Sequence, residues 1–143
     1  MNFNRGNESR RHRSAKKLIT AKLELKGYSI FPEHKFCDIA AFKNSNGRIE
    51  ILCLEFETSA RTCDTNVMRN IANGAHHCLT IGDNATVKAA IERKFQKKLS
   101  AEILTKTSVM TLGEFLGDVG ASMRGIDERS NNAMIKEKLK ETL

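Results

Sequence analysis

One stretch of the sequence, residues 49–59, ends an apolar run with two carboxylates. It reads Ile-Glu-Ile-Leu-Cys-Leu-Glu-Phe-Glu-Thr-Ser, a pattern that predicts a largely buried β-strand. Because side chains alternate along a strand, Glu55 and Glu57 share one face. Two like charges on such a face repel each other and lose hydration. Either a divalent cation offsets them, or the strand reaches the surface and water solvates its last residues.

A second carboxylate-bearing strand precedes this one. Residues 36–42 read as a strand, and Asp38 stands inside the apolar run although Asp is disfavoured in strands. The sequence Asn-Ser-Asn-Gly at 44–47 is typical of a hairpin turn. Antiparallel pairing across this turn would bring Asp38 close to Glu55 and Glu57. We therefore expect three carboxylates near one point at the open end of the hairpin, and a turn-capping role for Asp38 is the alternative.

Helices and strands alternate over the remainder of the chain. Residues 7–26 are expected to form a helix with Asn7 as its N-cap and Gly27 as its end. A three-strand meander followed by strands alternating with helices predicts an α/β fold, in which helices flank a mixed central sheet. Residues 1–120 are expected to form one domain and residues 121–143 a C-terminal tail, mobile or helical. The other expected elements are strands at 28–31, 77–81 and 101–105, and helices at 64–75, 85–99 and 111–116.

Positive charge is unevenly spread along the sequence. The 143-residue chain carries a formal net charge of +7, and its first helix is rich in Lys and Arg. Such a bias suggests a polyanionic partner, most simply DNA, although a basic run is often only a solubilising surface. The helix at 64–75 has a polar stripe rich in Asn, which favours helix less than Lys or Glu does. The expected nucleic-acid contacts on these two helices are Arg10, Arg11, Arg13, Lys17, Asn66, Arg69 and Asn70.

The sequence offers little sign of a membrane or an oxidising environment. No apolar run approaches the roughly 20 residues of a membrane span, and the basic start has no signal-peptide core. We therefore expect a cytoplasmic protein without membrane contact. The four cysteines lack CxxC spacing and are expected to be reduced. His76 and His77 beside Cys78 leave open a transition-metal site, and with it a zinc-stabilised regulator, although no second pair stands at ligand spacing.

The element order and the placed carboxylates together resemble the PD-(D/E)XK nuclease superfamily, whose restriction-endonuclease-like fold has a mixed sheet with flanking helices. Members bind a metal through an Asp on one strand and Glu-x-Lys on the next. Asp38 matches the Asp, and Glu55 matches the Glu. The basic first helix with Glu8 is similar to the opening of archaeal Holliday-junction resolvases, in which an acidic residue on that helix joins the site. The resemblance covers about residues 5–107.

A metal site follows from this resemblance. It implies Mg²⁺ or Mn²⁺ held by Asp38, Glu55 and the backbone carbonyl of Phe56. It also implies that Glu57 orients the attacking water or binds a second metal. Glu8 would hold a water in the outer shell of the metal.

One position departs from the pattern, because Glu57 stands where most members have Lys. Some active restriction enzymes carry Glu there, and so do some members that have lost catalysis. A neighbouring element supplies the Lys in other members, and Lys22 and Arg69 are the candidates here. Lys22 falls in the apolar sector of the first helix, where its side chain is otherwise expected to extend to solvent.

Together these features predict a divalent-metal-dependent endodeoxyribonuclease that hydrolyses phosphodiester bonds by nicking, double-strand cutting or junction cleavage. A catalytically inactive nuclease-like module that binds DNA is the alternative. A homodimer is compatible with two-strand cutting. The sequence leaves open the choice between DNA and RNA, the structure or sequence that is cut, and the oligomeric state.

Overall fold

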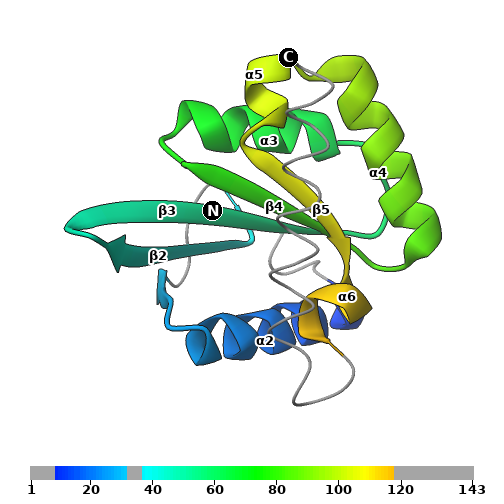
Figure 1. Cartoon of the computed structure of the whole chain (residues 1–143). Coiled ribbons are helices and arrows are strands. Elements are labelled where there is room, and N and C mark those ends of the chain that lie inside the picture. The colour runs from blue at the N-terminus through cyan, green and yellow to red at the C-terminus, as the bar shows by residue number, and fades with distance from the viewer. Residues whose placement is uncertain (1–8, 32–36, 118–143) are drawn as a thin grey trace, which may run out of the picture.

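The computed structural model describes residues 9–31 and 37–117. Its helices are α2 (Arg10–Leu25), α3 (Cys63–Ala72), α4 (Ala85–Lys98), α5 (Ala101–Leu104) and α6 (Leu112–Leu116). Its strands are β1 (Ser29–Phe31), β2 (Ile39–Ser45), β3 (Arg48–Glu57), β4 (His77–Gly82) and β5 (Thr107–Thr111). They form one sheet in the order β1-β2-β3-β4-β5, with an antiparallel β1-β2-β3 meander and parallel β3-β4-β5 pairs. The expected α/β architecture, a mixed sheet flanked by helices, is thus confirmed (Figure 1).

The turn between β2 and β3 determines which residues face each other across the hairpin. Asn46 and Gly47 both have positive φ, at 53° and 78°. A two-residue turn of this kind matches the twist of the strands that it joins. The register pairs Ile39, the first residue of β2, with Leu54 of β3. The expected hairpin is confirmed, and its open end lies where β2 begins and β3 approaches its last residues.

Strand β2 begins later than the sequence predicts. Residues 36–38 were expected within the strand, but Cys37 and Asp38 form a bend before Ile39. Asp38 turns its carboxylate to accept a hydrogen bond from the backbone N–H of Phe56, at 2.8 Å. A short polar side chain that binds the backbone competes with regular strand pairing. This bond reaches a backbone group 18 positions away, so it is a long-range contact and not the turn cap that the sequence left as an alternative for Asp38.

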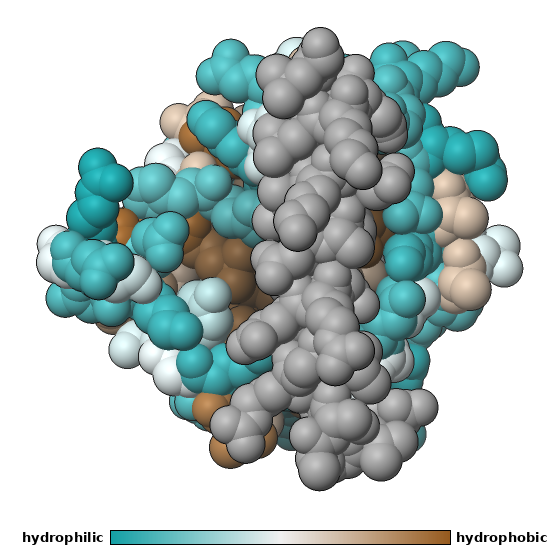
Figure 2. Space-filling model, in the orientation of Figure 1, coloured by the Kyte–Doolittle hydropathy of each residue, from teal (hydrophilic) through white to brown (hydrophobic). Residues whose placement is uncertain are grey.

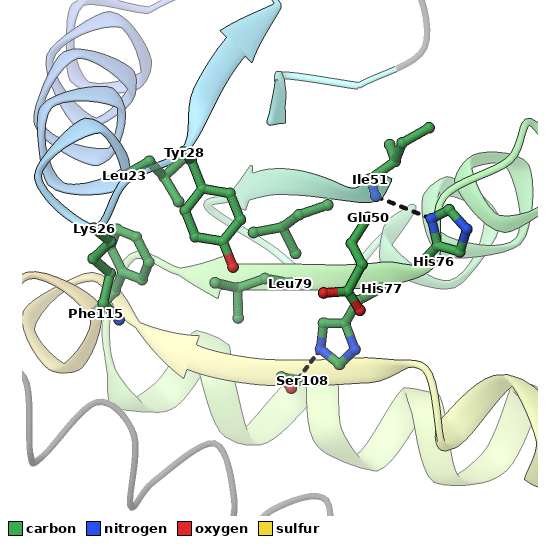
Figure 3. A pocket seen from close by; sticks show the side chains of 11 residues that line it. Leu23, Lys26, Tyr28, Glu50, Ile51, His76, His77, Leu79, Ser108 and Phe115 are labelled. Carbon is green, nitrogen blue, oxygen red and sulfur yellow. Dashed lines mark hydrogen bonds between the residues drawn. The ribbon is translucent and has the colours of Figure 1, made fainter. Parts of the chain in front are cut away.

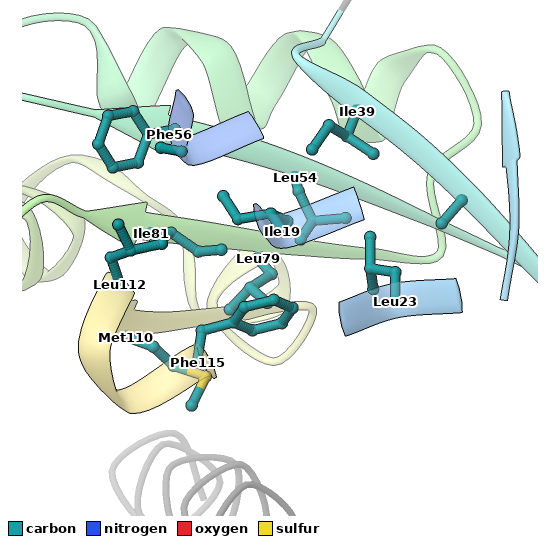
Figure 4. Close-up of a cluster of buried hydrophobic side chains, with 12 residues drawn as sticks. Ile19, Leu23, Ile39, Leu54, Phe56, Leu79, Ile81, Met110, Leu112 and Phe115 are labelled. Carbon is teal, nitrogen blue, oxygen red and sulfur yellow. The ribbon is translucent and has the colours of Figure 1, made fainter. Parts of the chain in front are cut away.

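Two apolar cores cover the two faces of the sheet. On one face α2 and α6 pack over Leu54 and Phe56 of β3 (Figure 4). On the other face α3 and α4 pack over Cys53. The alternation of β3 therefore places Glu55 and Glu57 on the α3 side, as the sequence predicts.

Helix ends follow local capping signals. The side chain of Ser9 accepts a hydrogen bond from the backbone N–H of His12 and caps α2. The expected cap Asn7 lies outside the described residues. Thr111 and Glu114 form a reciprocal capping box at the start of α6, which confirms the short helix expected there.

The prediction of a strand at 101–105 is wrong. These positions hold the short helix α5, and the edge strand β5 begins at Thr107 instead. Ser100 explains the helix, because its side chain accepts a hydrogen bond from the backbone N–H of Ile103. A short apolar run carries no periodicity of its own, so the cap decides its conformation.

Hydrophilic side chains cover much of the face seen in Figure 2, with an apolar area near the middle of the view. Large exposed apolar side chains are distributed over several elements: Leu18, Leu25, Phe31, Ile49 and Met68. In residues 9–31 and 37–117, no helix is long and apolar enough to cross a membrane.

Replacing Gly47 by Ala is expected to lower the free energy of unfolding by about 1–2 kcal/mol. The space around Gly47 is open, but its φ of +78° strains any residue with a Cβ. Gly113→Ala in α6 is the matched control, since its Cβ meets only an ordinary contact at 3.8 Å. This control should leave stability unchanged or raise it by up to about 1 kcal/mol. Urea denaturation measures both, and equal losses would contradict the turn conformation.

Candidate functional site

Asp38 lies at the open end of the hairpin, next to the N-terminal turn of α2. Its Oδ2 accepts the hydrogen bond from the Phe56 backbone N–H, and its Oδ1 lies 3.1 Å from Nε2 of His12. The imidazole of His12 also contacts the ring of Phe56 edge-on, with 5.4 Å between the ring centroids. The Asp38 carboxylate is therefore held at both oxygens, one by the sheet and one by the helix.

Glu55 is buried, with 6% of its surface exposed. Its Oε2 accepts a hydrogen bond from Nδ2 of Asn70 at 3.0 Å and lies 3.7 Å from a guanidinium nitrogen of Arg69. Burial raises the pKa of Glu55 to about 8; the charge of Asp38 adds to the rise, whereas the Asn70 amide opposes it. Near neutral pH this carboxyl group favours the protonated form unless further positive charge stabilises the ionised one.

Glu57 follows on the same face of β3 and is partly buried. Its Oε2 accepts a hydrogen bond from Nδ2 of Asn66 at 2.8 Å. Burial raises the pKa of Glu57; the Asn66 amide lowers it, and the charge of Asp38 raises it further. Helix α3 thus supplies one amide to each glutamate of the strand, from positions one helical turn apart.

The three carboxylates are electrostatically coupled. The charge of Asp38 raises the pKa of both Glu55 and Glu57. Each carboxylate nevertheless has its own hydrogen-bonding partner. Within the described ranges, no three Asp, Glu, His or Cys side chains group as ligands of one ion. A shared site of the three carboxylates, with Asp38, Glu55 and the Phe56 carbonyl as metal ligands, stays a prediction.

Two buried oxygen atoms close to Glu55 lack a hydrogen-bond partner in the part of the chain that the structure describes. They are Oδ1 of Asn70, whose amide nitrogen binds Glu55, and Oγ1 of Thr80, which is paired with Glu55 in the β3–β4 register. An unsatisfied buried polar atom costs about 1–3 kcal/mol, so such atoms point to a missing partner. Hard cations prefer oxygen donors, so the chemistry around Glu55 fits Mg²⁺ or Mn²⁺.

The cations predicted to contact nucleic acid on α2 fall into two groups. Arg10, Arg13 and Lys17 are exposed along the helix. Arg11 is also exposed but donates to Oδ1 of Asp83 through its Nε at 2.9 Å. This ion pair joins the start of α2 to the residue after β4, so Arg11 has a structural role in this conformation.

The nucleic-acid contacts predicted on α3 need correction. Asn70 is 1% exposed and its amide is used by Glu55, so it offers no surface to DNA. Asn66 likewise turns its amide toward Glu57. Of the three residues predicted there, Arg69 alone is exposed. Asn66 and Asn70 face the sheet, where neutral amides can satisfy buried carboxylate oxygens without a second buried charge.

Lys22 also differs from its expected position. It is buried, and its Nζ donates to the backbone carbonyl of Leu116 at 3.4 Å. Its side chain therefore reaches the last turn of α6, where carbonyl groups lack helical partners, instead of extending to solvent. Of the two candidates for the missing lysine, Arg69 is the one that lies beside Glu55. The predicted site residue Glu8 lies outside the described residues.

His12 is the residue that sequence reasoning missed. It stands in the run Arg-Arg-His-Arg and reads as one more polar residue of a basic helix. The spacing of apolar residues on the helix could have revealed its position, because Ala15 and Ile19 follow His12 by three and seven positions and are both buried. Residues at this spacing share one helix face, so His12 belongs to the side of α2 that meets the sheet.

A separate cavity of about 330 Å³ is lined by residues of α2, β3, β4, β5 and α6 (Figure 3). Within it, Nε2 of His77 lies 2.8 Å from the hydroxyl of Ser108. His76 accepts a hydrogen bond from the backbone N–H of Ile51 through Nδ1. Cys78 instead packs in the core beneath α3 and α4. Alternation along β4 places His77 and Cys78 on opposite faces of the sheet, and among the described residues no group of three metal ligands includes them.

Comparisons with known proteins assign neither a family nor a function to this chain, so the functional interpretation rests on the site. No protein-family model matches the chain, and no curated protein matches it. The groups present are three coupled carboxylates, two of them with a raised pKa, beside a guanidinium and an imidazole. Such a set can hold a cation or exchange a proton.

Replacing Glu55 by Gln is expected to stabilise the fold at high pH. Because the pKa of Glu55 is about 8 in the folded state against 4.5 unperturbed, ionisation removes stability as the pH rises through this interval. Gln retains an oxygen for the Asn70 amide. Thermal unfolding in EDTA should show an advantage over wild type that grows across this window and is constant above it. An advantage independent of pH would contradict the raised pKa.

Proposed function

We propose that the chain is a divalent-metal-dependent DNA endonuclease with a restriction-endonuclease-like domain. The observation that carries the proposal is Glu55, a buried carboxyl group with a pKa near 8, beside Asp38 at the open end of the hairpin. Carboxyl groups that resist ionisation in this way cluster at functional sites. Exposed Arg and Lys residues on α2 support DNA as the partner, because they attract phosphates.

The donor chemistry of the site supports Mg²⁺ or Mn²⁺. Asp38 and Glu55 would hold the ion together with the backbone carbonyl of Phe56. Oδ1 of Asn70, which has no hydrogen-bond partner among the described residues, would be a further oxygen ligand of the ion close to Glu55. When bound, such a metal lowers the pKa of a water ligand and neutralises charge on the phosphate.

The remaining roles belong to side chains around the two glutamates. Glu57 would accept a hydrogen bond from the attacking water, and Asn66 restrains its carboxylate. Arg69, which is exposed and close to Glu55, would contact a non-bridging phosphate oxygen. It would supply the positive charge that the superfamily usually takes from Lys. The cations of α2 would hold the DNA backbone, and such contacts carry little sequence information.

A catalytically inactive DNA-binding module is the second candidate. Glu57 in place of Lys favours it, because a carboxylate repels the phosphate that a lysine would attract. A guanidinium nitrogen of Arg69 also lies 3.7 Å from Oε2 of Glu55, so Arg69 can neutralise this carboxylate in place of a metal ion. A module of this kind would bind DNA through α2 and leave it intact.

Cleavage assays distinguish the two candidates. The purified protein is incubated with supercoiled plasmid and with a four-way junction, in Mg²⁺, in Mn²⁺ and in EDTA. We expect metal-dependent cleavage that Asp38→Asn and Glu55→Gln each reduce by about 10²-fold or more. Both variants should still bind DNA, because the cations of α2 are unchanged. Intact DNA under every condition, with binding retained, would favour the inactive module.

Binding of DNA is expected to depend on the outer side of α2. The double variant Arg13→Gln/Lys17→Gln should make the slope of log K against log salt shallower by about 0.9 for each phosphate that the protein no longer neutralises. Lys97→Gln/Lys98→Gln on α4 removes the same charge from another exposed surface and should change this slope much less. Fluorescence anisotropy at several salt concentrations measures both. Equal changes would show that net charge, and not the α2 surface, controls binding.

A further inference from the structure

His12 joins two residues on which the proposed site depends. Its Nε2 lies 3.1 Å from Oδ1 of Asp38. Its ring lies edge-on against Phe56, with the ring planes at 78°. Asp38 and Phe56 are themselves joined by the 2.8 Å hydrogen bond from the backbone N–H to Oδ2. The three residues come from α2, from the bend before β2 and from β3, and each contacts the other two.

The contact with Asp38 assigns a proton to one nitrogen of His12. An ionised carboxylate only accepts hydrogen bonds, so Nε2 must be the donor. Because the Phe56 N–H occupies the other oxygen, the carboxylate is restrained in one orientation. Partners that orient a metal ligand in this way raise the affinity of the site, since the ligand loses less freedom on binding.

Resting on the proposed function, we infer that His12 is a positioning residue that orients the Asp38 carboxylate for the divalent cation. Its edge-on contact supports Phe56, whose backbone carbonyl is the third expected ligand. His12 acts through Asp38 and does not itself contact the metal.

Two variants separate the hydrogen bond of His12 from its ring contact. His12→Gln keeps an N–H donor at a reach close to that of Nε2 but removes the ring. His12→Phe keeps a ring against Phe56 but removes the donor. Ser14→Ala, at an exposed position in the same turn of α2, is the control for a change of helix surface. Thermal unfolding in EDTA establishes that each variant is folded.

The affinity of the full chain for Mn²⁺, measured by titration calorimetry, is the readout, and it does not depend on cleavage. We expect His12→Phe to weaken binding by about tenfold or more, as removal of a partner that orients a ligand typically does. His12→Gln and Ser14→Ala should bind close to wild type, and this rescue by Gln would assign the effect to the donor.

Three results would overturn the inference, and they separate its failure from that of the proposed function. If wild type binds Mn²⁺ and His12→Phe binds it equally well, His12 has no positioning role and the proposed function stands. The same holds if His12→Gln is as weak as His12→Phe, because the donor is then not the cause. If wild type binds no Mn²⁺, the inference and the proposed function fail together.

Discussion

The burial of one carboxyl group at the end of a central strand governs the arrangement around it. Strand β3 has neighbours on both sides, and α3 lies over the face that carries Glu55. The Asn70 amide and the Arg69 guanidinium compensate only part of the missing hydration, because the pKa of Glu55 is still raised to about 8. The site therefore has an unbalanced negative charge whenever Glu55 is ionised. A divalent cation would remove this imbalance, and the same charge would bring the cation to the site.

The loop after Glu57 fixes the position of α3 relative to the two glutamates. The ammonium group of Lys94 on α4 donates to the carbonyl of Ala60 at 3.1 Å and lies 3.4 Å from the carboxylate of Asp64. These contacts tie the loop and the first turn of α3 to α4. The two Asn side chains that follow are thereby held over the sheet, so the polar interior depends on contacts made outside it.

The hairpin and the side of β3 that carries the glutamates could be predicted from sequence. An Asn-Gly turn and strict alternation determine both, because each is a local property of the chain. The partners of the carboxylates could not, because the side of α3 that faces the sheet depends on how buried residues such as Val67 pack. The bend at Asp38 depends on a backbone N–H that lies 18 positions away. Helical spacing indicates the face of α2 on which His12 lies, but its contact with Asp38 depends on the same kind of long-range packing.

The ionisation of Glu55 itself is the most direct test of this account. Carbon-13 NMR of the glutamate carboxyl groups, with Glu55 assigned through Glu55→Gln, would follow its titration in EDTA and then in Mg²⁺. We expect a pKa near 8 without metal and a clear fall when Mg²⁺ is added, because the cation stabilises the ionised form. A pKa near 4.5 in EDTA, or a raised pKa that Mg²⁺ leaves unchanged, would contradict it.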